Sequence, residues 1–334
     1  MRKLILSTAK PTQISAAESG CAPIVTYSNG IKQHTSCIGC ADSPCISYKE
    51  DEISISGLSS LSFDQNLNTC PTSAIKLVKN SAVPVIDTNS CINCGVCTSR
   101  CPTGAIYLSD SGKMTVASGA RKCLQPSNGD NESTVKAFRK VAWSKPIIRD
   151  DDKVALTFTA SYDKASSISG SRIQNLLSRN LLIELGLKAG SSRTGDVNNR
   201  MDVYVALAET SVATEVEISS AQIDAPRSVL DSIAVLHGRH KIAKSQIDGL
   251  IIVGELPNSR SEFWAVLSDI ESVLKIKIKV LTTTAAAILV HNKVKLSKIQ
   301  DLESSLSIRK LFEATTGRKL GLKSGAYSAF EAGK

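Results

Sequence analysis

The sequence predicts an α+β domain followed by an α/β domain with a mixed sheet. Eight of the ten cysteines fall between residues 37 and 101, in two groups of similar spacing. A polar run with Pro126 and Gly129 follows them and is typical of a linker. Strand and helix signals alternate in the remainder, which favours an α/β class. A chain of 334 residues with 42% apolar residues can bury two cores.

The same signals place the domain boundaries. We expect an N-terminal segment over residues 1–30, a cysteine-rich domain over 31–122, a linker over 123–135 and the α/β domain over 136–334. One short strand is expected ahead of the cysteines, over residues 23–27, because its residues are mostly β-branched or aromatic.

The cysteine-rich domain contains two copies of one pattern. The second copy, over residues 91–102, reads C-x2-C-x2-C-x3-C-P, and the first is a looser version that begins at Cys37. The closing runs are nearly identical, Cys-Pro-Thr-Ser-Ala-Ile from Cys70 and Cys-Pro-Thr-Gly-Ala-Ile from Cys101. Three thiolates at the second spacing can surround one corner of an iron–sulfur cube, and the fourth cysteine ligates another cluster. The repeat therefore predicts two half-domains and two clusters.

Residues 31–110 resemble a bacterial-type ferredoxin with two 4Fe-4S clusters, a family in which ligation is crossed between the two halves. That fold is a small α+β domain, so the resemblance implies a ferredoxin-like dicluster domain here. It also implies which cysteines share a cluster. One set would be Cys37, Cys40, Cys45 and Cys101, and the other would be Cys70, Cys91, Cys94 and Cys97.

The first half departs from the family pattern. Four residues separate Cys40 from Cys45, and 24 residues separate Cys45 from Cys70. Cys21 is therefore an alternative third ligand, and a three-iron cluster is an alternative in this half. Charged residues at 49–52 in the longer insertion predict an excursion into solvent.

Other cysteine chemistries explain less of the pattern. Zinc prefers four ligands in two close pairs, which accounts for neither the repeat nor the proline after each closing cysteine. The apolar residues 4–6 are too short for a secretory signal, and no run of about eighteen apolar residues predicts a membrane span. Clustered cysteines in such a chain indicate a reducing compartment. We therefore expect a cytoplasmic iron–sulfur protein without a membrane part.

The first elements of the α/β domain follow from periodicity. Residues 154–160 alternate like a strand, and residues 162–171 are polar and loop-like. Leucine and isoleucine recur at helical spacing over 173–185. Two strands are then expected over 201–208 and 213–219, joined by a tight turn at Thr210 and Ser211.

The later elements follow from capping signals and apolar runs. Asp224 is a good N-cap and Pro226 fits a first helical turn, so a helix is expected over 225–240. The unbroken apolar run at 249–253 predicts a buried strand. Residues 259–262 form a capping box for a helix through residue 273. The remaining expected elements are a strand over 275–281 and a basic helix over 298–316.

The predicted hairpin gathers acidic residues on one face. A two-residue turn at Thr210 and Ser211 would pair Val203 with Ile218 and Val205 with Val216. Side chains alternate along a strand, so the opposite face would carry three carboxylates. These belong to Asp202, Glu215 and Glu217. Neighbouring carboxylates repel one another unless a cation lies between them, and oxygen ligands of this kind suit Mg²⁺.

Residues 170–285 resemble the core of PD-(D/E)xK nucleases, in which an Asp begins one strand and Glu-x-Lys lies on the next. The resemblance implies a Mg²⁺-dependent endonuclease in which Asp202, Glu215 and Glu217 are catalytic. Glu184, on the preceding helix, would be an additional metal ligand. The alternative is a half-exposed hairpin whose outer face is simply polar.

The nuclease resemblance has three departures. Glu217 stands where lysine is usual, and no proline precedes Asp202. The first strand of the core is not evident between residues 186 and 200. If a lysine is required, Lys241 or Lys244 would have to approach from elsewhere in the chain.

Charge and missing motifs limit the function classes. The net charge is +9, of which +3 comes from the 11 basic and 8 acidic residues before position 125 and +6 from the 29 and 23 after it. A basic C-terminal part is compatible with binding DNA. No Walker A motif and no G-x-G-x-x-G after a strand is present, so no nucleotide, flavin or nicotinamide site is predicted.

Three hypotheses follow from these patterns. The first is electron transfer by two 4Fe-4S clusters, serving the attached domain or a redox partner protein. The second is a DNA nuclease whose clusters are structural or redox-sensing. The third is a scaffold in a larger complex with purely architectural clusters. The sequence predicts no oligomeric state.

Overall fold

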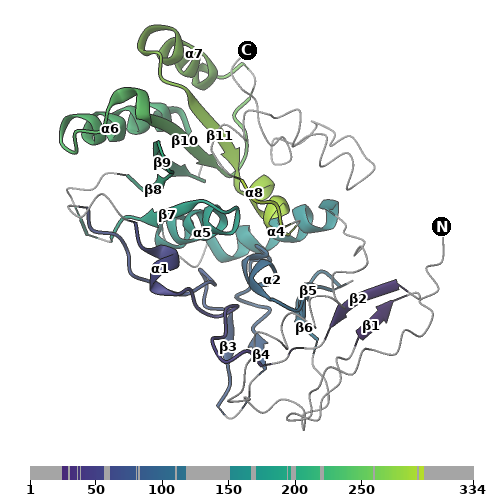
Figure 1. The fold of residues 1–334 in the computed structure, drawn as a ribbon. Coiled ribbons are helices and arrows are strands. Elements are labelled where there is room, and N and C mark those ends of the chain that lie inside the picture. Colours follow the sequence, from purple (N-terminus) through teal and green to yellow (C-terminus); the bar gives the residue numbers. More distant parts are fainter. Residues whose placement is uncertain are drawn as a thin grey trace. The chain divides into compact units, whose positions relative to one another are not determined.

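In the computed structural model the chain forms two compact units (Figure 1). Unit 1 comprises Met1–Ser47 and Asn68–Ala165, and unit 2 comprises Tyr48–Leu67 and Ser166–Lys334. The chain therefore passes between the units three times. The structure describes residues 25–28, 31–35, 37, 39–55, 61–79, 81, 83–109, 111–117, 151–166, 171–193, 195–196, 201–218, 222–258, 260–291 and 293–296. Cys21, the predicted linker at 123–135 and the expected helix at 298–316 lie outside these residues.

Unit 1 is built from short antiparallel hairpins. The strands are β1 (Val25–Ser28), β2 (Ile31–Thr35), β3 (Ile75–Leu77), β4 (Pro84–Ile86), β5 (Ile106–Leu108) and β6 (Met114–Val116), and they pair consecutively. Strands β3 and β5 each begin five residues after a closing cysteine, so the two hairpins repeat the same arrangement. Helix α2 (Val96–Arg100) begins after Gly95, whose positive φ of 82° suits glycine.

Helix α4 (Asp151–Ser166) corrects the strand predicted over 154–160 and the loop predicted after it. The apolar residues in this stretch also fit a helical period, and one face of the helix is buried by Val154, Ala155, Phe158 and Tyr162. Asn93 of unit 1 donates from Nδ2 to Ser161 Oγ at 2.8 Å. Because buried side chains recur at three- and four-residue spacing, the helix buries more apolar surface than a strand would.

Unit 2 contains a five-stranded mixed sheet in the order β11-β10-β9-β8-β7. Its strands are β7 (Lys188–Ser191), β8 (Val203–Ala206), β9 (Ser211–Glu217), β10 (Ile247–Val253) and β11 (Ile278–Thr282). Strands β7, β8 and β9 are antiparallel, whereas β10 is parallel to both β9 and β11. The predicted mixed sheet is therefore present, and β7 is an additional strand between residues 186 and 200.

Helices cover both faces of this sheet (Figure 1). Helices α6 (Ala225–Gly238) and α7 (Glu262–Leu274) pack on one face, where they bury Val229 and Phe263 against Ile251 and Val280 of the sheet. Helices α5 (Ser171–Glu184) and α8 (Thr283–His291) lie on the other face. The helices expected over 173–185 and 225–240 are thus confirmed, and α8 is an additional one. The helix expected from the capping box at 259–262 is present too, but its N-cap is Ser261, whose side chain accepts from the N–H of Phe263. Among the described helices, none is long and apolar enough to cross a membrane.

The pairing of β8 with β9 differs from the predicted register. Val203 pairs with Thr214 and Ala206 pairs with Ser211, so four residues rather than two connect the strands. The offset from the predicted pairing is four residues. An even offset keeps every side chain on its expected face, because side chains alternate with a period of two. In the observed register, position 202, just before β8, is opposite Glu215 of β9, whereas the predicted register placed it opposite residue 219.

Candidate cluster-binding site

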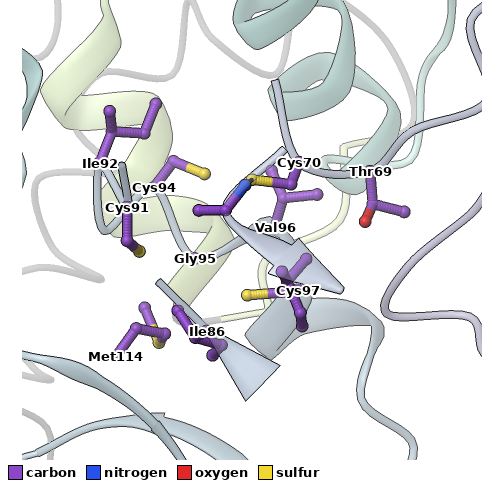
Figure 2. Close-up of a pocket in the computed structure, with 12 residues that line it drawn as sticks. Thr69, Cys70, Ile86, Cys91, Ile92, Cys94, Gly95, Val96, Cys97 and Met114 are labelled. Atoms are coloured by element: carbon purple, nitrogen blue, oxygen red, sulfur yellow. Dashed lines mark hydrogen bonds between the residues drawn. The ribbon is translucent and has the colours of Figure 1, made fainter. Parts of the chain in front are cut away.

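The sulfurs of four cysteines, three from the second copy and one from the first, surround one cavity in unit 1 and are named the second cysteine group here. Figure 2 shows the side chains of Cys70, Cys91, Cys94 and Cys97 turned towards the same space. Cys70 comes from the first closing run, whereas the other three precede or begin α2. The remaining lining residues are mostly apolar, and they are Thr69, Ala74, Ile75, Ile86, Ile92, Gly95, Val96 and Met114.

The other four predicted ligands are named the first cysteine group, because three of them belong to the first copy. Cys101 is close enough to Cys37, Cys40 and Cys45 to perturb the titration of all three thiols. Cys45 also contributes to the raised pKa of Cys97 in the second cysteine group. Cys70 therefore lies with Cys91, Cys94 and Cys97 around one cavity, and Cys101 lies near Cys37, Cys40 and Cys45.

The two Cys-Pro turns hold their sulfurs in the same way. The backbone N–H of Ala74 donates to Cys70 Sγ at 3.1 Å, and the N–H of Ala105 donates to Cys101 Sγ at 3.2 Å. The hydroxyl of the threonine two residues after each cysteine also lies near the sulfur, at 3.4 Å for Thr72. The corresponding distance for Thr103 is 3.6 Å. The repeated letters Cys-Pro-Thr-x-Ala therefore encode two hydrogen-bond donors aimed at one sulfur.

The residue at the x position of each turn has a left-handed backbone. Its φ is 54° at Ser73 and 72° at Gly104. This conformation turns the chain back so that the following alanine N–H reaches the sulfur. Serine in the first copy has a higher backbone conformational energy here than glycine in the second, because a Cβ atom disfavours positive φ.

Burial disfavours the thiolate form of these cysteines. Burial first, and then the charges of Cys101 and Cys37, raise the pKa of Cys40 to about 12. Burial is also the main cause that raises the pKa of Cys91 to about 11, with Cys70 contributing. The pKa values of Cys45 and Cys97 are raised for the same reasons. Several thiolates can share such a space only when cations such as iron neutralise them.

The described residues contain no three His, Cys, Asp or Glu side chains placed to hold one metal ion. A cubane cluster makes a different demand, because each of its irons is bound by a separate cysteine around the cube. The donor set fits such a group, because four sulfurs face a mostly apolar cavity and Cys70 Sγ also accepts from the N–H of Ala74. Cys70, Cys91, Cys94 and Cys97 would hold it, and it would supply one-electron chemistry when bound.

The two ends of the 24-residue insertion between Cys45 and Cys70 pair with each other in unit 1, and this pairing is named the neck here. Ser47 bridges Asn68 in an antiparallel pair, and the N–H of Thr69 donates to Ile46 O at 3.1 Å. Thr69 Oγ1 also donates to Cys45 O at 2.6 Å. The neck therefore fixes the two cysteines that flank the insertion, although they belong to different sulfur groups.

The middle of the insertion, Tyr48–Leu67, belongs to unit 2 and is named the strap here. Phe63 forms a bridge with Ser192 beyond the end of β7, and the N–H of Asp64 donates to Ser191 O at 2.8 Å. The ring of Phe63 stacks on Tyr204 of β8 with centroids 5.9 Å apart. Lys49, Glu50 and Asp51 are exposed as predicted, whereas the later residues of the strap pack on the edge of the sheet, which the sequence did not predict.

The edge strand is shaped to receive the strap. A Cβ atom added to Gly190 of β7 would lie 2.8 Å from Ile55 and 2.9 Å from Phe63. Only glycine leaves room for these two side chains. Leu61 of the strap is buried in the same apolar cluster as α6 and α7.

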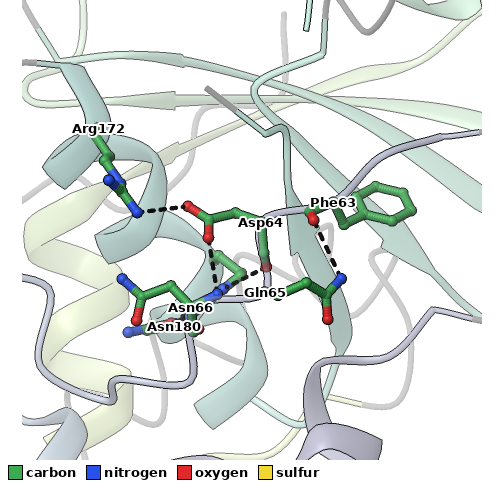
Figure 3. A network of polar contacts seen from close by, with 7 residues as sticks. Phe63, Asp64, Gln65, Asn66, Arg172 and Asn180 are labelled. Atoms are coloured by element: carbon green, nitrogen blue, oxygen red, sulfur yellow. Dashed lines mark hydrogen bonds and ion pairs between the residues drawn. The ribbon is translucent and has the colours of Figure 1, made fainter. Parts of the chain in front are cut away.

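Figure 3 shows Asp64 and Asn66 of the strap beside Arg172 and Asn180 of α5. Arg179 of the same helix anchors the strap from inside unit 2. Its side chain is completely buried. The guanidinium donates to Asn66 O at 2.8 Å and to Asp64 O at 3.4 Å, and to Asn180 Oδ1 at 2.9 and 3.0 Å. It also lies 5.9 Å from the ring centroid of Tyr48. Burial lowers the pKa of Arg179, and Tyr48 and Asp64 oppose that shift.

The three carboxylates predicted on the hairpin do lie near one another. Asp202 accepts from Asn175 Nδ2 at 2.9 Å and from the N–H of Val216 at 2.9 Å. Burial raises the pKa of Glu215 to about 8, with Asp202 and Glu217 adding to the shift. Burial also raises the pKa of Asp202, although its two hydrogen bonds act in the opposite direction. Burial and its two acidic neighbours therefore favour the protonated form of Glu215.

Glu184 is not part of this acidic group. It lies nine residues after Asn175 on α5, which corresponds to about 13.5 Å along the helix axis at about 1.5 Å per residue. The side chain is buried and its Oε1 is 3.3 Å from the hydroxyl of Tyr48 in the strap. The structure therefore assigns Glu184 to the strap contact and not to the carboxylates of the hairpin.

The raised pKa of Glu215 predicts a pH-dependent stability. A carboxyl that binds its proton more tightly when folded contributes stability below its ordinary pKa of 4.5, and that contribution is lost as the pH passes about 8. In EDTA the free energy of unfolding should fall over this range by up to about 1.4 kcal/mol per pH unit. Glu215→Gln should flatten the dependence in urea unfolding from pH 5.5 to 8. Glu209→Gln, in the exposed turn of the same hairpin, should leave it unchanged.

Comparison with known proteins supports the cysteine site. Residues 84–107 match the Fer4 family, described as a 4Fe-4S binding domain. The matched stretch contains Cys91, Cys94, Cys97 and Cys101. The chain therefore contains an iron–sulfur domain of ferredoxin type. Neither the curated proteins nor the solved structures provide a significant match.

Proposed function

We propose that this protein binds two 4Fe-4S clusters and transfers single electrons between them. The observation that carries the proposal is the crossed grouping, in which Cys101 joins the first cysteine group and Cys70 joins the second. Crossed ligation ties the two clusters into one small domain, which favours a short path between them. The attached α/β domain or a redox partner protein would receive the electron, and the compartment would be the reducing cytoplasm.

Voltammetry of anaerobically purified protein tests this proposal. Two reversible low-potential one-electron waves are expected. Thr103→Val should lower one of them and Thr72→Val the other, because each change removes a hydroxyl near one ligand sulfur. A shift of about 20–60 mV corresponds to one hydrogen bond of about 0.5–1.4 kcal/mol. Clusters that decompose on reduction would contradict electron transfer and would favour the scaffold role.

A second candidate is a DNA nuclease of the PD-(D/E)xK type, favoured by the topology of unit 2. The sequence leaves the first core strand unassigned, and β7 now occupies that position. The order α5, β7, β8, β9, α6, β10 follows the helix, strands, helix and strand that the resemblance requires. Asp202 lies level with Glu215 across the hairpin, and the clusters would then be structural or redox-sensing.

The Mg²⁺ site that a nuclease of this type needs is incomplete in the described residues. Asp202, Glu215 and Glu217 are the residues that would bind Mg²⁺, but they form no single-ion site in the described part of the chain. Glu217 also replaces the usual lysine. For these reasons no catalytic step through Mg²⁺ is assigned.

Cleavage assays decide whether the second candidate holds. The holo-protein should cut DNA only with Mg²⁺, and Asp202→Asn should lower the rate at least about a hundredfold if it holds the metal. Glu209→Gln is the matched control, because it changes a carboxylate in the exposed turn of the same hairpin. If the holo-protein with Mg²⁺ leaves duplex, single-stranded and supercoiled DNA intact, the nuclease hypothesis is contradicted.

A further inference from the structure

The β3–β4 hairpin separates the second sulfur cavity from solvent. Ile75 and Ile86, which pair across the hairpin, both line that cavity. Lys76 and Val85 also pair directly, and side chains alternate along a strand, so these two face away from the cavity. Both are exposed, Val85 at 54% of its surface. A single layer of backbone therefore lies between the sulfur cavity and this outer face.

The end of the same hairpin is also exposed and apolar. Leu77 and Val78 are 45% and 50% exposed, and Lys79 beside them is exposed too. Three of the seven large apolar side chains exposed in the described part of the chain are thus found in this one hairpin. Isolated exposed apolar residues are ordinary, whereas a group of them rimmed by polar residues marks an interaction site. The hairpin patch is defined as Lys76, Leu77, Val78, Lys79 and Val85.

The charge of the hairpin patch indicates the kind of partner. Within the described residues, neither Lys76 nor Lys79 forms an ion pair, and no acidic residue occurs from 71 to 86. The patch therefore combines three exposed apolar side chains with two exposed lysines. A complementary surface would be apolar with an acidic rim, because opposite charges guide two proteins into the correct encounter.

We propose that the hairpin patch is the docking surface for an acidic single-electron carrier protein. The inference rests on the proposed electron-transfer function, and it names the partner for that function. The carrier gives up one electron and the cluster region behind Ile75 and Ile86 accepts it. A patch of five residues suits such a partner, because redox encounters use small and weak interfaces. Electrostatic attraction then supplies the association rate that a small apolar contact does not.

Stopped-flow mixing of oxidised holo-protein with reduced flavodoxin, an acidic one-electron carrier, tests the surface. The wild-type second-order rate constant should fall as salt is raised. Lys76→Glu/Lys79→Glu should lower the low-salt rate constant at least about tenfold, and Lys79→Glu alone by about threefold. Lys113→Glu is the matched control, since it makes the same charge change on the exposed turn of the other hairpin. It should change the rate constant by less than about twofold.

Reduction by dithionite separates failure of the surface from failure of the function. All variants should be reduced by dithionite at the wild-type rate, because a small inorganic reductant needs no docking surface. If dithionite fails to reduce wild-type protein reversibly, both the electron-transfer function and the docking proposal that depends on it are wrong. If dithionite reduces the clusters but the double variant reacts with flavodoxin as fast as wild type, the docking surface alone is wrong. Loss of self-association in the double variant, measured by sedimentation, would assign the patch to contacts between copies and overturn the proposal.

Discussion

Cys101→Ala is expected to empty the cluster site of the first cysteine group and not that of its own sequence motif. Cys101 follows Cys97 by four residues, but it lies with Cys37, Cys40 and Cys45 in space. Losing one of four cysteine ligands should cost that site its cluster and reduce bound iron from about eight atoms per chain to about four. Cys70→Ala should cause the same loss at the other site.

Alkylation followed by mass spectrometry identifies the emptied site. Cys101→Ala should make the cysteines of the first group reactive while Cys91, Cys94 and Cys97 stay protected. Cys70→Ala should give the reverse pattern. Cys123→Ala, outside both ligand sets in the sequence, should keep the full iron content. Protection in the opposite pattern would show uncrossed ligation and would overturn the assignment of both closing cysteines.

Arg179→Met is expected to release the strap from unit 2. The guanidinium is completely buried and satisfies the backbone oxygens of Asp64 and Asn66, which a methionine would leave without a donor. Removing one member of a buried charged network typically costs about 3–5 kcal/mol. Hydrogen exchange should therefore accelerate at the amides of Asp64 and Arg193, which join the strap to the sheet edge. Arg179→Lys should be intermediate, because lysine keeps the charge but lacks the fork of donors.

Arg172→Met provides a matched control on the same helix. Arg172 pairs with Asp64 Oδ2 at 3.4 Å, but 59% of its side chain is exposed. An exposed ion pair of this kind contributes less than about 1 kcal/mol, so the strap should stay attached. Strap amides that exchange at the wild-type rate in Arg179→Met would contradict the anchoring role of the buried arginine.

The sequence predicts the cysteine groups well because their chemistry is local. Each closing Cys-Pro-Thr-x-Ala run carries a cysteine and the alanine N–H that donates to its sulfur, so this part of the geometry is visible in the sequence. The carboxylates of the hairpin are predicted for a related reason. Apolar residues alternate along β8 and β9, and the period of two survives the four-residue error in register.

Other elements escape prediction for physical reasons. The four residues of β7 begin Lys-Ala-Gly, which has low strand propensity, and tertiary pairing with β8 decides their conformation. The strap is missed because its partners are distant in sequence. Nothing near Phe63 signals a sheet edge that begins at Lys188, and Arg179 looks like an ordinary surface residue of an amphipathic helix. The one available hint is that polar residues at 178–180 interrupt the apolar face of α5 and are all buried.

The strap also imposes an order of events during synthesis. Its last residue leaves the ribosome about 120 residues before β7 does, which corresponds to roughly 6–24 s of translation. Throughout that interval the nascent chain can close the neck between Cys45 and Cys70, but Ile55, Leu61 and Phe63 have no sheet to cover. The growing protein therefore presents an apolar loop that chaperones can recognise. Unit 2 can complete its fold only after β7 has been synthesised and the strap has packed against it. A chain truncated before β7 should therefore keep the apolar side chains of the strap exposed.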